Sequence, residues 1–162
     1  MDGNNIGHGG NCNNGVEPLV PTPIMLQELT SDGLRPVGAP QKILDRGQYD
    51  GPLVEAPSLV KVDNLYILFF SSNCYNGDLY DVSYATSVNG IRNNGGEYQK
   101  SSAPLLLTGY NNGKLFSPGG LDVGPGGVNV LFHADKVRAD AGVRQMWAGQ
   151  IRVDVGARTV SI

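Results

Sequence analysis

Short apolar runs, each interrupted within a few positions by Gly, Pro, Asn or Asp, follow one another along most of the chain. Residues 65–70 are apolar or aromatic at every position, whereas residues 80–84 alternate aromatic or apolar side chains with polar ones. A continuous run indicates a strand buried on both faces, and alternation indicates a strand with one buried face. No window of about a dozen residues keeps the i, i+3, i+4 spacing of an amphipathic helix. The pattern therefore predicts an all-β fold.

The pattern also repeats, with a period of about 60 residues and about four strands in each period. Such a period is typical of the blades of a β-propeller. The alternative is chance similarity between β-rich segments. The matched pairs are 65–69 with 128–132, Tyr84-Ala85 with Trp147-Ala148, Ala56-Pro57 with Ser117-Pro118, and the Gly-x-Arg-x-Val sequence at 33–37 with that at 156–160.

Composition agrees with many short strands joined by turns. The 162 residues include 23 Gly and 10 Pro, and only 17% are charged, against ~25% in average soluble domains. A chain of this length can bury an adequate core as one domain.

The charge distribution excludes several classes of partner. The net charge is -3, and no cluster of Lys and Arg is longer than a pair, so nucleic acid is not an expected partner. No apolar run approaches the ~18 residues that span a bilayer, so no membrane partner is expected. No signal-peptide pattern is visible at the start of the sequence.

Cys12 and Cys74 both lie in Asn-rich segments, and the sequence leaves open whether they form a disulfide. A bridge closing so long a loop would stabilise the fold by about 4 kcal/mol in the loop-closure model. Two cysteines without a Cys-x-x-Cys motif, together with only two histidines, do not suggest a zinc site. We expect no metal and no cofactor.

One acidic residue stands in an otherwise uncharged segment. Glu55 precedes Ala56-Pro57, and its carboxylate should face a groove or a partner, because burying it unpaired is costly. Residues 55–71 read Glu-Ala-Pro-x-Leu-x-Lys-x-x-x-x-Tyr-x-Leu-x-x-Ser. This sequence resembles the general-acid segment of family 43 glycoside hydrolases, five-bladed β-propeller enzymes that cut arabinan- and xylan-type glycosides with inversion. The similarity continues through residues 80–87 and 146–151.

The resemblance implies a partial five-bladed β-propeller of roughly two and a half blades, each a four-stranded antiparallel sheet. No linker separates the units, so residues 1–162 are expected to form a single incomplete domain, the C-terminal portion of the family's propeller. The expected units are the end of one blade at 1–52, a second blade at 53–114 and a third at 115–162. The resemblance also implies an extracellular protein.

By the same resemblance, Glu55 is the general acid of a glycosidase acting on arabinose- or xylose-containing plant polysaccharides. The family's general base and the aspartate that tunes the acid have no match, so the chain alone is expected to be inactive. The alternative for Glu55 is an ordinary edge carboxylate paired with a nearby Lys or Arg, such as Lys61. Gly120 stands where the family commonly has a histidine, and His133 is expected to pack in the core.

Further candidates for carbohydrate binding are Asp2, His8, Tyr49 and Tyr75, which lie in or beside Gly- and Asn-rich turns. For Asp2 and His8 the alternatives are a turn-forming residue and a solvated surface residue. The alternative function for the whole chain is a non-catalytic carbohydrate-binding or structural β-protein. An open ring would leave apolar faces uncovered, so self-association through the open propeller face is expected.

Overall fold

The structure is a computed structural model that describes residues 7–137 and 143–162. Its regular elements are almost all strands, because Gly, Pro and Asn interrupt the chain before a helix can extend. The short helical turn α1 (Tyr110–Gly113) has left-handed angles at Asn111 and Asn112. The strands are β1 (Ile24–Leu29), β2 (Pro36–Leu44), β3 (Val54–Val62), β4 (Leu65–Ser72), β5 (Asp81–Ser87), β6 (Gln99–Lys100), β7 (Phe116–Val123), β8 (Asn129–Asp135), β9 (Arg144–Gln150), β10 (Arg152–Asp154) and β11 (Thr159–Ser161).

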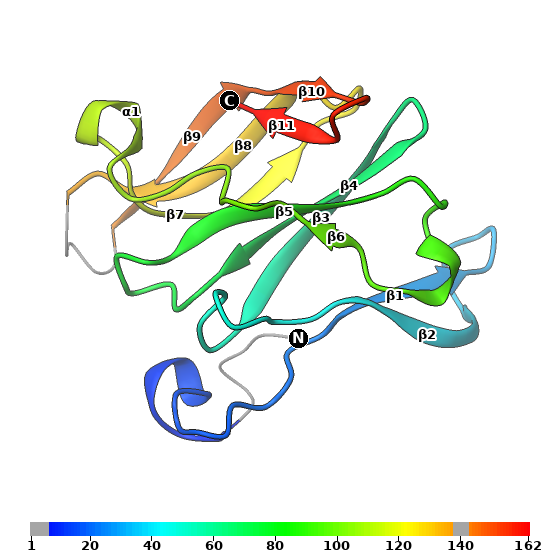
Figure 1. The fold of residues 1–162 in the computed structure, drawn as a ribbon, viewed down its shortest axis with the longest axis horizontal. Helices are drawn as coiled ribbons and strands as arrows, with labels where there is room; N and C mark the ends of the chain where they lie inside the picture. Colours follow the sequence, from blue (N-terminus) through cyan, green and yellow to red (C-terminus); the bar gives the residue numbers. More distant parts are fainter. Residues whose placement is uncertain (1–6, 138–142) are drawn as a thin grey trace.

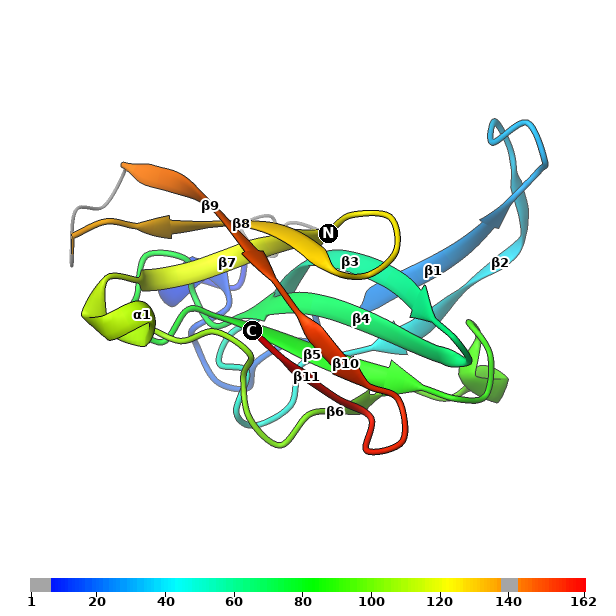
Figure 2. The ribbon, with the colours of Figure 1, turned by 90° about the horizontal axis from the view of Figure 1, so that it is seen from above.

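These strands form antiparallel sheets in chain order. The four-stranded sheet has the order β3-β4-β5-β6, and the three-stranded sheet has the order β7-β8-β9. Two hairpins, β1-β2 and β10-β11, form two-stranded sheets. The β1-β2 hairpin lies on one side of the β3–β6 sheet and the β7–β9 sheet on the other (Figures 1 and 2).

Strand β4 is buried on both faces, as its unbroken apolar run predicts. Leu65, Ile67 and Phe69 pack in one hydrophobic cluster with side chains of β7 and β8. Leu68 and Phe70 pack in a second cluster with side chains of β1 and β2. Because successive side chains of a strand point to opposite faces, β4 anchors a neighbour on each side of its sheet.

The repeated X-Pro step has the same local structure in two sheets. Ala56 and Ser117, each followed by Pro, have positive φ values of 51° and 47°. At both sites the register of the strand with its neighbour shifts, in β3 after Glu55 and in β7 after Phe116. An irregularity of this kind changes the direction in which nearby side chains point. It therefore sets the direction of the Glu55 side chain.

The β7–β9 sheet differs from the expected four strands. Ile151 separates β9 from β10, and its N–H bonds to the carbonyl of Val128 at 2.8 Å. Beyond this point β10 pairs with the three residues of β11 as a separate hairpin. The described sheets lie in an open row, and the number of blades remains a prediction.

The segment before β1 is held by polar contacts and a covalent bond. Cys12 and Cys74 form a disulfide with their Cα atoms 5.7 Å apart, which ties this segment to the loop after β4. The fully buried Asn14 donates to the carbonyls of Val20 and Pro52 and accepts from the Val20 N–H. These contacts hold the segment beside the strand ends that carry Glu55.

Candidate active site

Glu55 lies half-buried at the irregular step of β3, and a buried tyrosine holds it. The Tyr80 phenol donates a hydrogen bond of 2.7 Å to Glu55 Oε1. Burial and, after it, the Glu55 charge hold the pKa of the Tyr80 phenol well above its usual value. The phenol therefore remains a donor throughout the physiological pH range. Lys61 is not the partner of Glu55, since its Nζ lies over the Tyr66 ring, 5.4 Å from the centroid.

Two glycines of β7 let the neighbouring sheet approach this pair. A Cβ on Gly119 would lie 1.9 Å from Cε1 of the Tyr80 ring, and one on Gly120 would lie 2.5 Å from Nε2 of His133. The Gly120 N–H donates to Ser71 Oγ at 2.8 Å. The Ser71 hydroxyl also lies near the Tyr80 phenol, and its effect is to lower the pKa of that phenol. The β7 backbone thus contacts both Ser71 and the ring of Tyr80, the residue that holds Glu55.

Arg144, at the start of β9, contacts the residues around Glu55 and Tyr80 from the β7–β9 sheet. Its Nη1 donates to the carbonyl of Ser117 and to Nδ1 of His133, both at 2.8 Å, and its Nη2 donates to the carbonyl of Tyr75. The guanidinium carbon lies 5.2 Å from the centroid of the Tyr80 ring, in cation–π geometry. Arg144 thus joins the loop after β4 to β7 and β8.

The ring of His133 stacks on that of Tyr80, with centroids 6.2 Å apart and planes 11° apart. Burial and the positive charge of Arg144 lower the pKa of His133 below its usual value. The core position expected for His133 is therefore only partly correct. The residue is half-buried, but its ring belongs to the polar cluster around Glu55.

The other candidates lie in different places. Tyr75 reaches the cluster through its carbonyl, and its side chain is partly exposed. His8 donates from Nε2 to the carbonyl of Pro18 at 3.0 Å, within the segment before β1. Tyr49 is exposed at the edge of a separate cavity. Asp2 lies outside the described residues.

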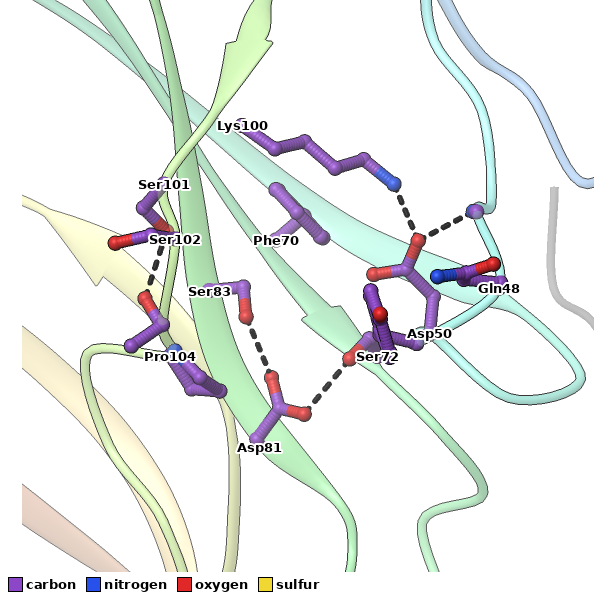
Figure 3. Close-up of a pocket in the computed structure, with 13 residues that line it drawn as sticks. Gln48, Asp50, Phe70, Ser72, Asp81, Ser83, Lys100, Ser101, Ser102 and Pro104 are labelled. Atoms are coloured by element: carbon purple, nitrogen blue, oxygen red, sulfur yellow. Dashed lines mark hydrogen bonds and ion pairs between the residues drawn. The ribbon is translucent and has the colours of Figure 1, made fainter.

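The cavity beside Tyr49 lies on the other face of the β3–β6 sheet and has a volume of about 200 Å³. Figure 3 shows its polar side chains converging from β4, β5, β6 and the loop before β3. Lys100 is ion-paired with Asp50, and its Nζ also donates to the carbonyl of Asp45. Ser72 Oγ and Ser83 Oγ donate to Asp81 at 2.7 and 2.8 Å.

Asp81 is the most buried carboxylate of this cavity. Burial raises its pKa above the usual value, although three side chains donate hydrogen bonds to it. Ser71 and Ser72 are neighbours on β4, yet Ser71 contacts the Glu55 cluster and Ser72 contacts Asp81. The end of β4 therefore carries two polar sites, one on each face of the sheet.

The described part of the chain shows neither a metal-binding cluster nor a membrane-spanning helix. In residues 7–137 and 143–162 no group of three or more His, Cys, Asp and Glu side chains is arranged to hold a metal ion. No helix within the same residues has the length and apolar character needed to cross a bilayer.

Comparison with known proteins identifies the fold. No protein-family model and no curated protein sequence matches the chain. A thermostable family-43 glycoside hydrolase of known structure matches 86% of the chain and 46% of its own length, with 23% identity and a TM-score of 0.71. The chain has the fold of a family-43 glycoside hydrolase.

Two further enzymes with solved structures are similar to this family-43 fold. An endo-1,4-beta-xylanase from Bacteroides thetaiotaomicron has 26% identity and a TM-score of 0.62, and the match covers 76% of this chain and 43% of the enzyme. An arabinanase from Bacillus subtilis has 21% identity and a TM-score of 0.64, with coverages of 85% and 47%. The chain thus spans less than half the length of each of these proteins.

Within this family-43 fold, the sequence singled out Glu55 as a candidate acid but did not indicate its contact with Tyr80 or the positions of His133 and Arg144 beside it. Tyr80 stands at the start of a segment that resembles the family, and it follows a turn. That position could have indicated a residue of the site. Nothing in the sequence around Arg144 indicated its role, because its partners come from three distant segments. His133 was misjudged because an apolar strand normally buries such a residue.

We expect Gly119→Ala to lower the free energy of unfolding by about 1–3 kcal/mol, as overpacking of a filled site does. The added Cβ would overlap the Tyr80 ring, which is 2% exposed and closely packed. Urea denaturation of the wild-type chain, of Gly119→Ala and of a control variant measures the free energy of unfolding. Gly96→Ala is the matched control, because its Cβ would make ordinary contact at 3.5 Å with the Asn93 carbonyl oxygen. Equal stability of the two variants would show that the Tyr80 ring does not lie against β7.

Proposed function

We propose that the chain is the acid-carrying portion of a glycoside hydrolase that acts by inversion on arabinose- or xylose-containing plant polysaccharides. The observation that carries the proposal is the setting of Glu55, at an irregular step of β3 with Tyr80 holding one carboxylate oxygen. Within the described residues, the second oxygen of the half-buried Glu55 has no hydrogen-bond partner. That oxygen is the one that can meet a glycosidic oxygen. The arabinanase and xylanase with similar folds suggest the class of substrate.

Inversion needs a second carboxylate ~6.5–9.5 Å from the acid, to activate water on the opposite face of the sugar. In the part of the chain that the structure describes, the hydrogen bonds around Tyr80 include no carboxylate other than that of Glu55. Asp81 lies on the opposite face of the sheet, where it cannot share a substrate with Glu55. We propose, as the family resemblance implies, that the base comes from outside these residues.

We expect the purified 162-residue chain to show no measurable hydrolysis of aryl arabinofuranosides or aryl xylosides. One carboxylate cannot both protonate the leaving group and activate water in an inverting reaction. The absorbance of the released aryl alcohol measures the rate of hydrolysis. Activity that disappears in Glu55→Gln but persists in Glu97→Gln, which alters an exposed carboxylate, would contradict the expectation and show that the chain supplies its own base.

A second candidate function, non-catalytic carbohydrate binding, is favoured by the cavity in Figure 3. Tyr49 is one of the residues that line this cavity and is 86% exposed, so its aromatic ring can stack on a sugar. Binding of arabino- and xylo-oligosaccharides by calorimetry separates the two functions. Loss of binding in Tyr49→Ala with no change in Glu55→Gln would favour the second, and the opposite result would favour the first.

An extracellular location remains part of the proposal. The Cys12–Cys74 disulfide supports it, because such bonds persist in oxidising compartments. Thiol titration of the denatured protein from its producing cells tests the location. Two reactive thiols in freshly isolated protein would contradict it.

We also expect the isolated chain to self-associate in a concentration-dependent manner. Met146 (78% exposed) and Leu131 (48% exposed) lie on the face of the β7–β9 sheet opposite the core residues Val130 and Phe132. A sheet face of this kind favours association when no neighbour covers it. Light scattering over a range of concentrations measures the association, and Leu131→Ser combined with Met146→Ser should reduce it. A compact monomer at every concentration would contradict the expectation.

A further inference from the structure

The contact between Arg144 and His133 determines which imidazole nitrogen carries the proton. A guanidinium has only donors, so the His133 Nδ1 that meets Arg144 Nη1 at 2.8 Å must be an acceptor. An imidazolium has no acceptor, so the ring must be neutral, and its single proton lies on Nε2. The same arginine is anchored on the carbonyls of Ser117 and Tyr75, so its position does not depend on the histidine alone.

The charges around the ring favour the same state. Arg144 from β9 lies against Nδ1, and its positive charge opposes protonation of the imidazole. Asp135, two residues along β8, acts in the opposite direction but less strongly. The Tyr80 phenol, which faces the ring from the β3–β6 sheet, stays uncharged. Burial and the charge of Arg144 therefore keep the imidazole neutral, and the opposing effect of Asp135 is smaller.

The protonated nitrogen lies at the free side of the ring. Nε2 would be 2.5 Å from a Cβ on Gly120, so it occupies the space above a residue that has no side chain. Among the described residues, the buried side-chain polar atoms without a partner are Asp135 Oδ1 and Trp147 Nε1. No hydrogen-bond partner of Nε2 is found among the described residues either, and Nε2 is not one of these fully buried atoms.

We infer that His133 is a ligand-binding residue of the Glu55 site, whose neutral imidazole donates its Nε2–H to an oxygen of a bound carbohydrate. Tyr80 stacks against the His133 ring and donates its phenol hydrogen bond to Glu55, so it places this donor beside the acid. A neutral donor suits the uncharged hydroxyl and ring oxygens of a pentose. The class of ligand rests on the proposed function, whereas the protonation state of His133 does not.

Nuclear magnetic resonance of the imidazole nitrogens and carbons tests the inference on the intact 162-residue chain. We expect His133 at neutral pH in a single tautomer, with a protonated Nε2 and an unprotonated Nδ1, and to titrate below the ~6.5 of a free imidazole. Arg144→Met should move its titration upward and populate both tautomers. Arg152→Met, which alters an exposed arginine of β10, is the matched control, and the signals of His8 provide an internal reference.

Addition of arabinotriose gives the second part of the test. We expect the Nε2–H signal of His133 to shift together with that of Tyr80. His133→Phe keeps an aromatic ring against Tyr80 but removes the donor, and should weaken arabinotriose binding about threefold to tenfold, the range for one hydrogen bond.

The outcomes separate the inference from the proposed function. A proton on Nδ1, or a charged ring at neutral pH, overturns the inference whatever the sugar does, and the wild-type spectrum alone decides this if Arg144→Met fails to fold. A shift of Tyr80 without a shift of Nε2 overturns the inference and leaves the proposed function standing. No shift of any signal overturns carbohydrate binding at this site and, with it, the role of His133.

Discussion

Burial of β4 on both faces is the constraint on which the rest of the structure depends. A strand with Leu65, Ile67 and Phe69 on one face and Leu68 and Phe70 on the other is stable only when both faces are covered. The β1-β2 hairpin covers one face and the β7–β9 sheet covers the other. Each core cluster joins the β3–β6 sheet to at least one neighbouring sheet, so the relative position of the sheets follows from the packing of this single strand.

The same stacking creates the candidate site. Polar residues follow the apolar run at the end of β4, where Ser71 meets the β7 backbone and Ser72 meets Asp81. The irregular X-Pro step of β3 directs Glu55 toward Tyr80, and Gly119 leaves room for the ring. Glu55, Tyr80 and His133 thus come together only because two sheets meet at glycines. The acid and its neighbours are a product of sheet packing rather than of one local motif.

Local patterns of neighbouring residues could be interpreted from the sequence, whereas contacts between side chains far apart in the sequence could not. The apolar run of β4 and the repeated X-Pro step each depend on neighbouring residues, so the strands and the position of Glu55 could be predicted. The three hydrogen-bond partners of Arg144 lie in separate segments of the chain. The ion pair of Lys100 with Asp50 likewise joins β6 to the loop before β3. The three-stranded sheet was also missed, because only Ile151 separates β9 from β10 and nothing in the sequence marks the break.

Hydrogen exchange at the Gly120 amide tests most directly whether the two sheets meet as described. This N–H donates to Ser71 across the boundary between the sheets, so it reports on their contact and not on either sheet alone. We expect its exchange to be slowed to a degree comparable with the β4 amides, and to become at least about fivefold faster in Ser71→Ala, as loss of one hydrogen bond of about 1 kcal/mol implies. Exchange of Gly120 at the rate of an unstructured peptide, with β4 still protected, would contradict the stacking that builds the site.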